Sequence, residues 1–420
     1  MSQTNNDNTR AFLRNLIQSL YRLAEQPQSH DKPGSIRLKL AGGVSELPVI
    51  GHPEPIAQIA RQPEIFIKNY NNINMLGISR FNANGEQWRL RSALTQKQYM
   101  DAGRSDRLQH IRQQYEAALG SCANAASGRL PYLFLNASIG VFHEALGATL
   151  NEPDRLIILF DRIRNLLLRL QFYSWIPMQS GVQAALHSEA EDLLEAIDGY
   201  MLDEPGLQRL RQQFNDEMQA QPSFRANEEY LMNLFAGIET TVSTLLWITC
   251  QLAAYPEAQA NIREALKNDP TPAILDGFIS ETLRFYPPVP FVVRELARDF
   301  NVGGVTLRSG QIILVSIIGA HRHPDYWSRP CQFDPHRSEF MHNSYDKNAF
   351  IPFFQGSRMC GGARLARQEL REGTRALLLN YTISNNHDHA DIDYGLAMRP
   401  VDSALPEIRN LERSGIQLSN

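Results

Sequence analysis

Five long stretches in the middle of the chain carry apolar side chains at spacings of three and four residues. They cover residues 106–126, 133–150, 154–170, 182–202 and 228–255. Helix-breaking prolines lie near or between them, namely Pro131, Pro153, Pro177, Pro205 and Pro222. Apolar residues at this spacing share one face of a helix, and proline interrupts a helix because it has no N–H to donate. The sequence therefore predicts a mainly α fold in which these helices pack on one another.

Shorter strand-like runs occur at residues 35–40, 291–294, 302–307 and 311–317. The last of them is rich in β-branched residues and follows a Ser-Gly turn. These runs predict small β-sheets at the edge of the helical body. No internal repeat, low-complexity tract or linker interrupts the 420 residues. Length alone favours two or three domains, but we expect a single domain spanning residues 1–420.

Charge and cysteine content exclude several classes of protein. The formal net charge is −4, so nothing indicates a nucleic-acid partner. The cysteines, Cys122, Cys250, Cys331 and Cys360, form no CxxC pair, which argues against a disulfide framework or zinc ribbon and fits a reducing compartment. The N-terminal segment has neither a signal-peptide apolar region nor the roughly 20 apolar residues of a membrane span. We therefore expect a cytoplasmic protein without a membrane anchor.

The loop at residues 353–362 carries the most specific chemistry. Cys360 stands just before a helical-looking run, so its sulfur would lie at a helix N-terminus, where free N–H groups and the dipole favour a thiolate. Gly356 and Gly362 have no Cβ, so they permit tight turns and a close approach of the backbone to a flat macrocycle. Phe353 would shield the sulfur from water, and Arg358 offers a permanent cation to a nearby anion. Cysteine among glycines also serves as a packing or turn residue, so the pattern alone leaves both interpretations open.

A second segment, residues 234–241, lies inside a strong helical pattern. Gly237 costs roughly 1 kcal/mol there relative to alanine, and adjacent threonines crowd the preceding turn. Such a helix predicts a dent beside Ala236 and Gly237 for a small ligand, with Glu239 and Thr240 relaying protons to it. The alternative is a surface acid beside a threonine that bonds back to its own helix.

A third segment places Glu281 and Arg284 three residues apart on one helix face, with two prolines ending the helix. Most such pairs are exposed and contribute under about 1 kcal/mol. Here apolar neighbours surround the pair, which favours a buried, structural role.

Together these segments resemble the cytochrome P450 monooxygenases. The residues Phe353, Gly356, Arg358, Cys360 and Gly362 resemble the haem-ligand signature of that family, and residues 236–240 resemble its oxygen-activating helix. The resemblance implies the cytochrome P450 fold, a helical bundle that encloses haem and has small β-sheets at its edge. It also implies one haem b with Cys360 as the axial thiolate.

Further residues take their roles from the same resemblance. Arg337 would join Glu281 and Arg284 in a structural cluster, and Arg294 would bind a haem propionate alongside Arg358. Residues 85–92 resemble the helix whose tryptophan, here Trp88, and a following arginine hold the other propionate. The chain departs from that pattern, because the expected arginine position is Ser92. Of the two nearby arginines, Arg91 shares a helix face with Trp88 and is predicted to bind the propionate. Arg89 is expected to point away from it.

The activity implied by the resemblance is insertion of one oxygen atom from O2 into a mostly apolar small organic substrate, and we expect a role in secondary metabolism. Because the chain shows no flavin domain or dinucleotide fingerprint, we expect it to take electrons from a separate ferredoxin or flavodoxin and its reductase. We also expect a monomer. Arg364 and Arg367 would then meet an acidic partner. Rival functions are direct use of peroxide, oxidative coupling, desaturation or ring formation without oxygen insertion, and, outside enzymes, a haem sensor or carrier.

Overall fold

The computed structural model describes residues 2–25, 34–40, 43–121, 124–125, 129–175, 177–384 and 391–411. Its longer helices are α1 (Ser2–Glu25), α3 (Gly85–Ala102), α4 (Leu108–Gly120), α5 (Leu130–Ala145), α6 (Pro153–Tyr173), α7 (Ser180–Asp203), α8 (Pro205–Glu217), α9 (Ala226–Ala254), α10 (Pro256–Asn268), α11 (Ala273–Phe285) and α14 (Ala363–Asn380). Shorter ones are α2 (Pro53–Ala60), α12 (Ile317–His321) and α13 (Ser338–Met341). All five predicted helices are present as α4, α5, α6, α7 and α9, so the mainly α prediction is confirmed. Cys122 and the end of the first predicted helix lie outside the described residues.

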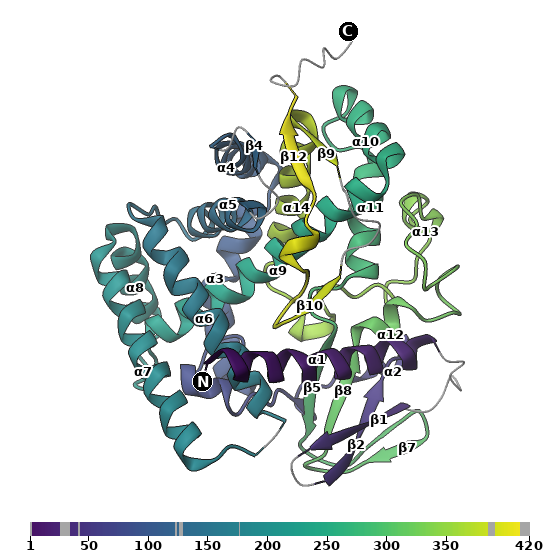
Figure 1. The fold of residues 1–420 in the computed structure, drawn as a ribbon. Coiled ribbons are helices and arrows are strands. Elements are labelled where there is room, and N and C mark those ends of the chain that lie inside the picture. The colour runs from purple at the N-terminus through teal and green to yellow at the C-terminus, as the bar shows by residue number, and fades with distance from the viewer. Residues whose placement is uncertain are drawn as a thin grey trace.

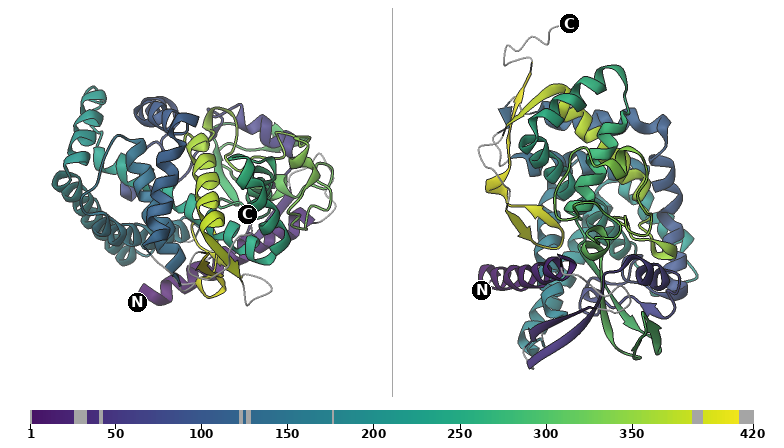
Figure 2. Two further views of the ribbon diagram at one scale, coloured as in Figure 1. Left: turned by 90° about the horizontal axis from the view of Figure 1, so that it is seen from above. Right: turned by 90° about the vertical axis from the view of Figure 1, so that its right-hand side faces the viewer.

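The largest sheet has the strand order β1-β2-β8-β5-β3. Its strands are β1 (Gly34–Leu40), β2 (Gly43–Ile50), β3 (Phe66–Ile67), β5 (Phe291–Leu296) and β8 (Ile312–Ser316). Only β2 and β8 run parallel, with Val49 opposite Leu314. The sheet lies at one end of the molecule, away from α4 and α10 (Figures 1 and 2). Three of the four predicted strands are confirmed as β1, β5 and β8.

Small two- and three-stranded sheets complete the described chain. They are formed by β6 (Phe300–Val302) with β7 (Val305–Leu307), β10 (Ile392–Tyr394) with β11 (Met398–Pro400), and β4 (Asn124–Ala125) with β12 (Glu407–Asn410) and β9 (Tyr381–Ser384). The strand predicted at 302–307 is wrong in detail, because Gly303 and Gly304 have φ of 54° and 74° and turn the chain into the β6–β7 hairpin.

Helix α9 runs through the middle of the molecule and packs against α5, α7, α11 and α14 (Figure 1). It is apolar on most sides, with Leu246, Trp247 and Ile248 fully buried. By length and hydropathy it could cross a membrane, but 72% of its most apolar window is buried inside the protein. A helix that is apolar all round belongs to the core, and α9 is therefore the central element of this fold.

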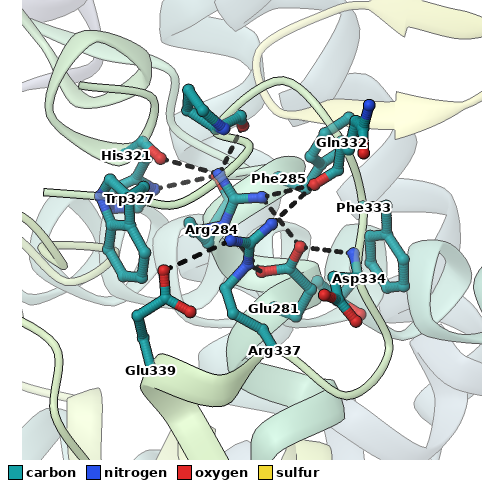
Figure 3. Close-up of polar contacts among 12 residues, drawn as sticks. Glu281, Arg284, Phe285, His321, Trp327, Gln332, Phe333, Asp334, Arg337 and Glu339 are labelled. Atoms are coloured by element: carbon teal, nitrogen blue, oxygen red, sulfur yellow. Dashed lines mark hydrogen bonds and ion pairs between the residues drawn. The ribbon is translucent and has the colours of Figure 1, made fainter. Parts of the chain in front are cut away.

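A buried ionic cluster ties α11 to the segment before α13 (Figure 3). The Glu281 carboxylate accepts hydrogen bonds from Arg284 Nε at 2.7 Å and Arg337 Nε at 2.6 Å, and all three side chains are fully buried. Both guanidinium groups also donate to the backbone carbonyl of Gln332, at 3.0 and 2.8 Å. The geometry agrees with the predicted structural role of these three residues.

Candidate functional site

One large cavity, of about 430 Å³, lies between α9, α14 and β5. Ten of the residues predicted for the site line it: Trp88, Ala236, Gly237, Glu239, Thr240, Arg294, Phe353, Arg358, Cys360 and Gly362. They come from segments that are up to 274 residues apart in the chain, from Trp88 to Gly362. The fold therefore brings together nearly all the chemistry-bearing residues that the sequence singled out.

The cysteine loop is shaped by two residues with left-handed backbone. Phe354 and Gly356 have φ of 57° and 70°, and the loop closes with a hydrogen bond from Cys360 N to the Phe353 carbonyl at 2.9 Å. Cys360 opens onto the cavity and precedes α14, which begins at Ala363. Burial raises the pKa of its thiol, whereas the Gly362 N–H and the positive charge of Arg80 lower it. The thiol becomes a stable thiolate once a cation binds the sulfur.

Four cations line this cavity, and among the described residues none of them pairs with a carboxylate: Lys68, Arg80, Arg294 and Arg358. Arg358 Nη1 is buried without a partner, and its guanidinium lies 3.9 Å from the centre of the Trp88 ring. Burial and the charges of the three arginines lower the pKa of Lys68 to about 6, so at neutral pH Lys68 is a cation only when an anion lies beside it. Buried charges are costly when unpaired, so this wall of the cavity favours an anionic ligand.

The α9 wall holds the predicted proton relay. Glu239 is buried and is not a surface acid, since its Oε2 accepts from Arg164 of α6 at 2.9 and 3.1 Å. Thr240 Oγ1 donates to the Ala236 carbonyl at 3.1 Å, which is the back-bonding alternative considered for it. A Cβ at Gly237 would come within 3.3 Å of the Phe142 ring, so the missing side chain also lets α5 pack closely.

Comparisons with known proteins agree with this arrangement. Residues 210–404 match the family model described as "Cytochrome P450". The chain is 33% identical over 199 residues to "Cytochrome P450 4A24" of Sus scrofa, covering 44% of this chain and 37% of that protein. It is 33% identical over 163 residues to "Cytochrome P450 3A31" of Mesocricetus auratus, covering 36% and 32%. The matched part thus spans about a third of the length of these curated relatives.

Solved structures extend the likeness to almost the whole chain. The crystal structure of CYP175A1 from Thermus thermophilus has a TM-score of 0.71 at 19% identity and covers 95% of this chain and 96% of its own. The haem domain of cytochrome P450DA has a TM-score of 0.68 at 19% identity, covering 94% and 91%. The match to the cytochrome P450 family lies in residues 210–404 of this chain. At this level of identity the structures show the cytochrome P450 fold, as the sequence predicted.

The cofactor of the cytochrome P450 family is haem b, and the cavity residues fit it. Its two propionates match the four unpaired cations, and its iron matches the Cys360 sulfur. Arginine binds carboxylates through two parallel N–H groups and stays charged when buried, which suits Arg294 and Arg358. The orphaned Nη1 of Arg358 is a donor that a propionate would satisfy.

Arg80 lies beside Ser92, the position at which the cytochrome P450 pattern expects an arginine. Its guanidinium donates to Gln96 Oε1 at 2.6 Å and to the carbonyl of Ser92 at 3.5 Å, so it lies beside the position that the family pattern gives to arginine. A Cβ on Gly361 would fall 2.0 Å from Arg80 Nη2, which shows how closely this cation approaches the cysteine loop. Sequence reasoning missed Arg80 and Lys68. The only signal was the departure at Ser92, which gave no position for a substitute.

The Arg91 prediction is wrong. Arg91 does not line the cavity, because its Nη1 donates to the buried Glu229 carboxylate at 3.1 Å and its guanidinium lies over Phe224. Glu229 in turn accepts from the backbone N–H of Arg80 at 3.0 Å, so this ion pair fixes the loop that carries Arg80. Arg89 pairs with Glu86 on the surface, as expected.

Gly356 also needs a correction, since it does not line the cavity. A Cβ at this position would come within 2.3 Å of the carbonyl oxygen of Ala60 at the end of α2. Its φ of 70° is strained for other residues. Gly356 is therefore a turn residue that lets the cysteine loop pack on α2, and it does not contact the cofactor directly.

Proposed function

We propose that this cytochrome P450 is a haem-thiolate monooxygenase that inserts one oxygen atom of O2 into a mostly apolar organic molecule. One observation carries the proposal: a single cavity holds a cysteine among unpaired cations on one side and the Glu239-Thr240 pair of α9 on another. Phe81, Leu167, Phe235 and Leu396 add apolar surface to the same cavity. Such a lining suits a hydrophobic substrate.

Cys360 is the proposed metal ligand, and Lys68, Arg80, Arg294 and Arg358 are the proposed propionate partners. The Gly362 N–H and the Arg80 charge both favour the ionised sulfur. With Cys360 as its thiolate ligand, a haem held here would supply the chemistry for cleaving an O–O bond. Phe353, at the start of the loop, lines the same cavity as Cys360 and would shield the sulfur from water once the cofactor is bound.

Glu239 and Thr240 are the proposed catalytic residues. Arg164 donates to the Glu239 carboxylate at the cavity wall, with Nη2 2.9 Å from Oε2. When Glu239 releases Arg164, its carboxyl can take up a proton and pass it toward Thr240 Oγ1. The Thr240 hydroxyl lines the cavity and has lone pairs left to accept a hydrogen bond from the protonated Glu239. To pass a proton on, its own O–H must turn from the Ala236 carbonyl toward the cavity, so that Thr240 releases one proton as it accepts another.

A separate ferredoxin or flavodoxin, with its reductase, is the proposed source of electrons. The enzyme itself is proposed to be a monomer in the cytoplasm that acts in secondary metabolism. The exposed side chains of Arg364 and Arg367 on α14 support this, since they lie just after the cysteine loop. Arg367 also lies over the ring of Phe353, 4.9 Å from its centre. An acidic carrier would meet these two cations near the ligand loop.

The carbon monoxide spectrum of the reduced holoenzyme tests the proposal. We expect the red-shifted Soret band of thiolate ligation, and we expect Cys360→Ser to abolish it. The matched control is Cys331→Ser, since Cys331 is a free, exposed cysteine that does not line the cavity. A wild-type spectrum without the red shift contradicts thiolate ligation and with it the proposed function.

Isotopically heavy dioxygen separates the rival activities once a substrate is found. Label in the organic product supports oxygen insertion. A coupled, desaturated or cyclised product without label supports the alternative enzymes, and a protein that binds haem but turns over no compound supports a sensor or carrier.

A further inference from the structure

Part of the cavity wall is built by elements that carry none of the residues proposed to hold haem. These elements are α1, the end of α6 and the turn between β10 and β11. From α1, Leu13 and Ile17 line the cavity, and each side chain is only 1% exposed. They are four residues apart, so they share one face of the helix. The N-terminal helix is therefore part of the ligand site.

Contacts along its length hold α1 in this position. In the first half of α1, Arg10 Nε pairs with Asp393 of β10 at 3.0 Å. Near the end of the helix, the Tyr21 hydroxyl lies 3.7 Å from Met398 Sδ. Phe12 packs its ring against the end of α6, with centroids 5.8 Å from Phe172 and 6.2 Å from Trp175. Figure 1 shows α1 lying across α6 and above the sheet. The wall is preformed, which lowers the cost of binding a ligand against it.

Two buried polar atoms belong to side chains that line this otherwise apolar region. Gln171 and Trp175 both line the cavity, and Gln171 Oε1 and Trp175 Nε1 are buried with no hydrogen-bond partner among the described residues. The backbone keeps turning at the end of α6, because Ser174 N donates to Leu170 O at 3.1 Å and Trp175 N to Phe172 O at 3.0 Å. Residues four apart on such a turn lie on one side.

An acceptor and a donor left unpaired inside a protein cost roughly 1–3 kcal/mol each. An unsatisfied buried atom in a native protein needs a physical reason, and a ligand that satisfies it when bound is one such reason. A hydroxyl group fits both, because it donates one hydrogen and accepts another. A ketone would satisfy only the indole N–H, and an alkyl end would satisfy neither.

We propose that Gln171 and Trp175 bind a hydroxyl group at one end of an otherwise apolar substrate, whose body lies against Leu13 and Ile17. The hydroxyl donates to Gln171 Oε1 and accepts from Trp175 Nε1. This inference rests on the proposed function and adds to it the substrate class, an apolar molecule that already carries an alcohol. The four residues are specificity determinants and take no part in the chemistry.

Alkylimidazoles test the proposal in the holoenzyme without knowledge of the natural substrate. Their imidazole nitrogen coordinates haem iron and shifts its spectrum, and the alkyl chain extends into the cavity. We compare 1-alkylimidazoles with their ω-hydroxyl counterparts over a graded series of chain lengths. At the length that reaches Gln171 and Trp175, we expect the hydroxyl probe to bind about tenfold more tightly than its alkyl match.

Gln171→Met assigns the effect, since it keeps side-chain length and removes the amide. We expect it to abolish the hydroxyl advantage, to leave the alkyl probe within about twofold, and to leave the melting temperature unchanged or higher because a buried unpaired carbonyl is gone. Gln183→Met, at an exposed position on α7, is the matched control and should change neither probe. Leu13→Trp should lower the affinity of both long probes, because the larger side chain occupies cavity space beside α1.

Two results would overturn this inference while leaving the proposed function intact. One is an equal affinity of the hydroxyl and alkyl probes at every chain length. The other is a hydroxyl advantage that survives Gln171→Met. Failure of the proposed function itself is seen separately, as a carbon monoxide spectrum without the thiolate band.

Discussion

Individual residues show why the cofactor site could be read only in part from the sequence. Cys360, Arg358 and Arg294 were predicted because each stands in a recognisable local pattern. Arg80 and Lys68 lie between β3 and α3, in a segment without such a pattern. Glu229 accepts the backbone N–H of Arg80, and Lys68 Nζ donates to the Arg80 carbonyl at 2.9 Å. When an arginine from another segment takes the place of the expected one in space, it stands at no fixed distance along the chain from Trp88. A single sequence therefore does not reveal it. For the same reason Arg91 was assigned wrongly, since its partner lies 138 residues away.

Arg80→Gln tests the replacement directly. We expect haem to leave the variant about tenfold faster or more, because one charge-assisted contact, typically about 1.5–3 kcal/mol, is lost. The thiol pKa of Cys360 should also rise in the haem-free protein, because the Arg80 charge lowers it. Transfer of haem to apomyoglobin and the rate of thiol alkylation against pH measure the two effects. Arg89→Gln, on the surface of α3, is the control, and equal haem loss from it would refute the assignment.

Whole elements were predicted where their patterns are strong. The helices between residues 106 and 255 have clear periodicity, and the structure contains them. Helix α1 was not predicted, because its polar first residues hide the apolar face formed by Leu13, Leu16, Ile17 and Leu20. Its partners, α6 and β10, follow it by more than a hundred residues, so only the fold shows that this face covers a ligand cavity.

Three helices meet at Glu369 of α14, which predicts a pH effect. Glu369 Oε1 accepts from the Tyr115 hydroxyl of α4 at 2.7 Å, and that hydroxyl lies 2.9 Å from Ser138 Oγ of α5. Burial raises the pKa of Glu369 to about 7. A carboxyl whose folded pKa exceeds its unfolded value of about 4.3 stabilises the fold fully below that unfolded value. The contribution is lost as the pH rises to about 7, and amounts to roughly 4 kcal/mol.

Glu369→Gln removes the ionisable group and keeps the size and shape of the side chain. We expect urea unfolding of the wild type to show a midpoint that falls between about pH 4.5 and 7 more steeply than that of the variant. The charged neighbours on these helices are Arg112 and Glu372, which pair with one another at 2.6 Å and are present in both proteins. Identical slopes for wild type and variant would show that Glu369 is not protonated in this range.

At the scale of the whole molecule, the Glu281 cluster joins parts of the chain that the cavity depends on. Arg284 of α11 donates to the carbonyl of His321 at the end of α12, and α12 follows directly on β8 of the main sheet. Arg284 Nη1 also donates to the Pro330 carbonyl at 2.8 Å. The sequence predicted the ion pairs, but not these carbonyl contacts, which depend on how loops far from α11 fold back onto it. Through them a local i, i+3 pair becomes a link between helices, loop and sheet.

Arg337→Met should therefore destabilise the entire fold. Removal of one partner leaves the buried Glu281 carboxylate with Arg284 alone, and such a loss typically costs about 3–5 kcal/mol. Three carbonyl contacts of Arg337, to Ser328, Arg329 and Gln332, are lost as well. We expect a large fall in the urea midpoint, seen together in far-ultraviolet circular dichroism and in haem absorbance, because the same link supports helices and cavity.

Arg329→Met is the control that separates a buried cluster from an ordinary ion pair in the same loop. Arg329 pairs with Asp334 at 2.6 Å, but its side chain is 64% exposed, so solvent screens the interaction and its loss should cost under about 1 kcal/mol. The two variants remove the same charge within eight residues of each other, and they differ in burial. If both lowered the urea midpoint equally, the stability would come from the net charge of the loop rather than from the Glu281 cluster. A fall confined to Arg337→Met shows that the buried carboxylate holds α11 to the rest of the protein.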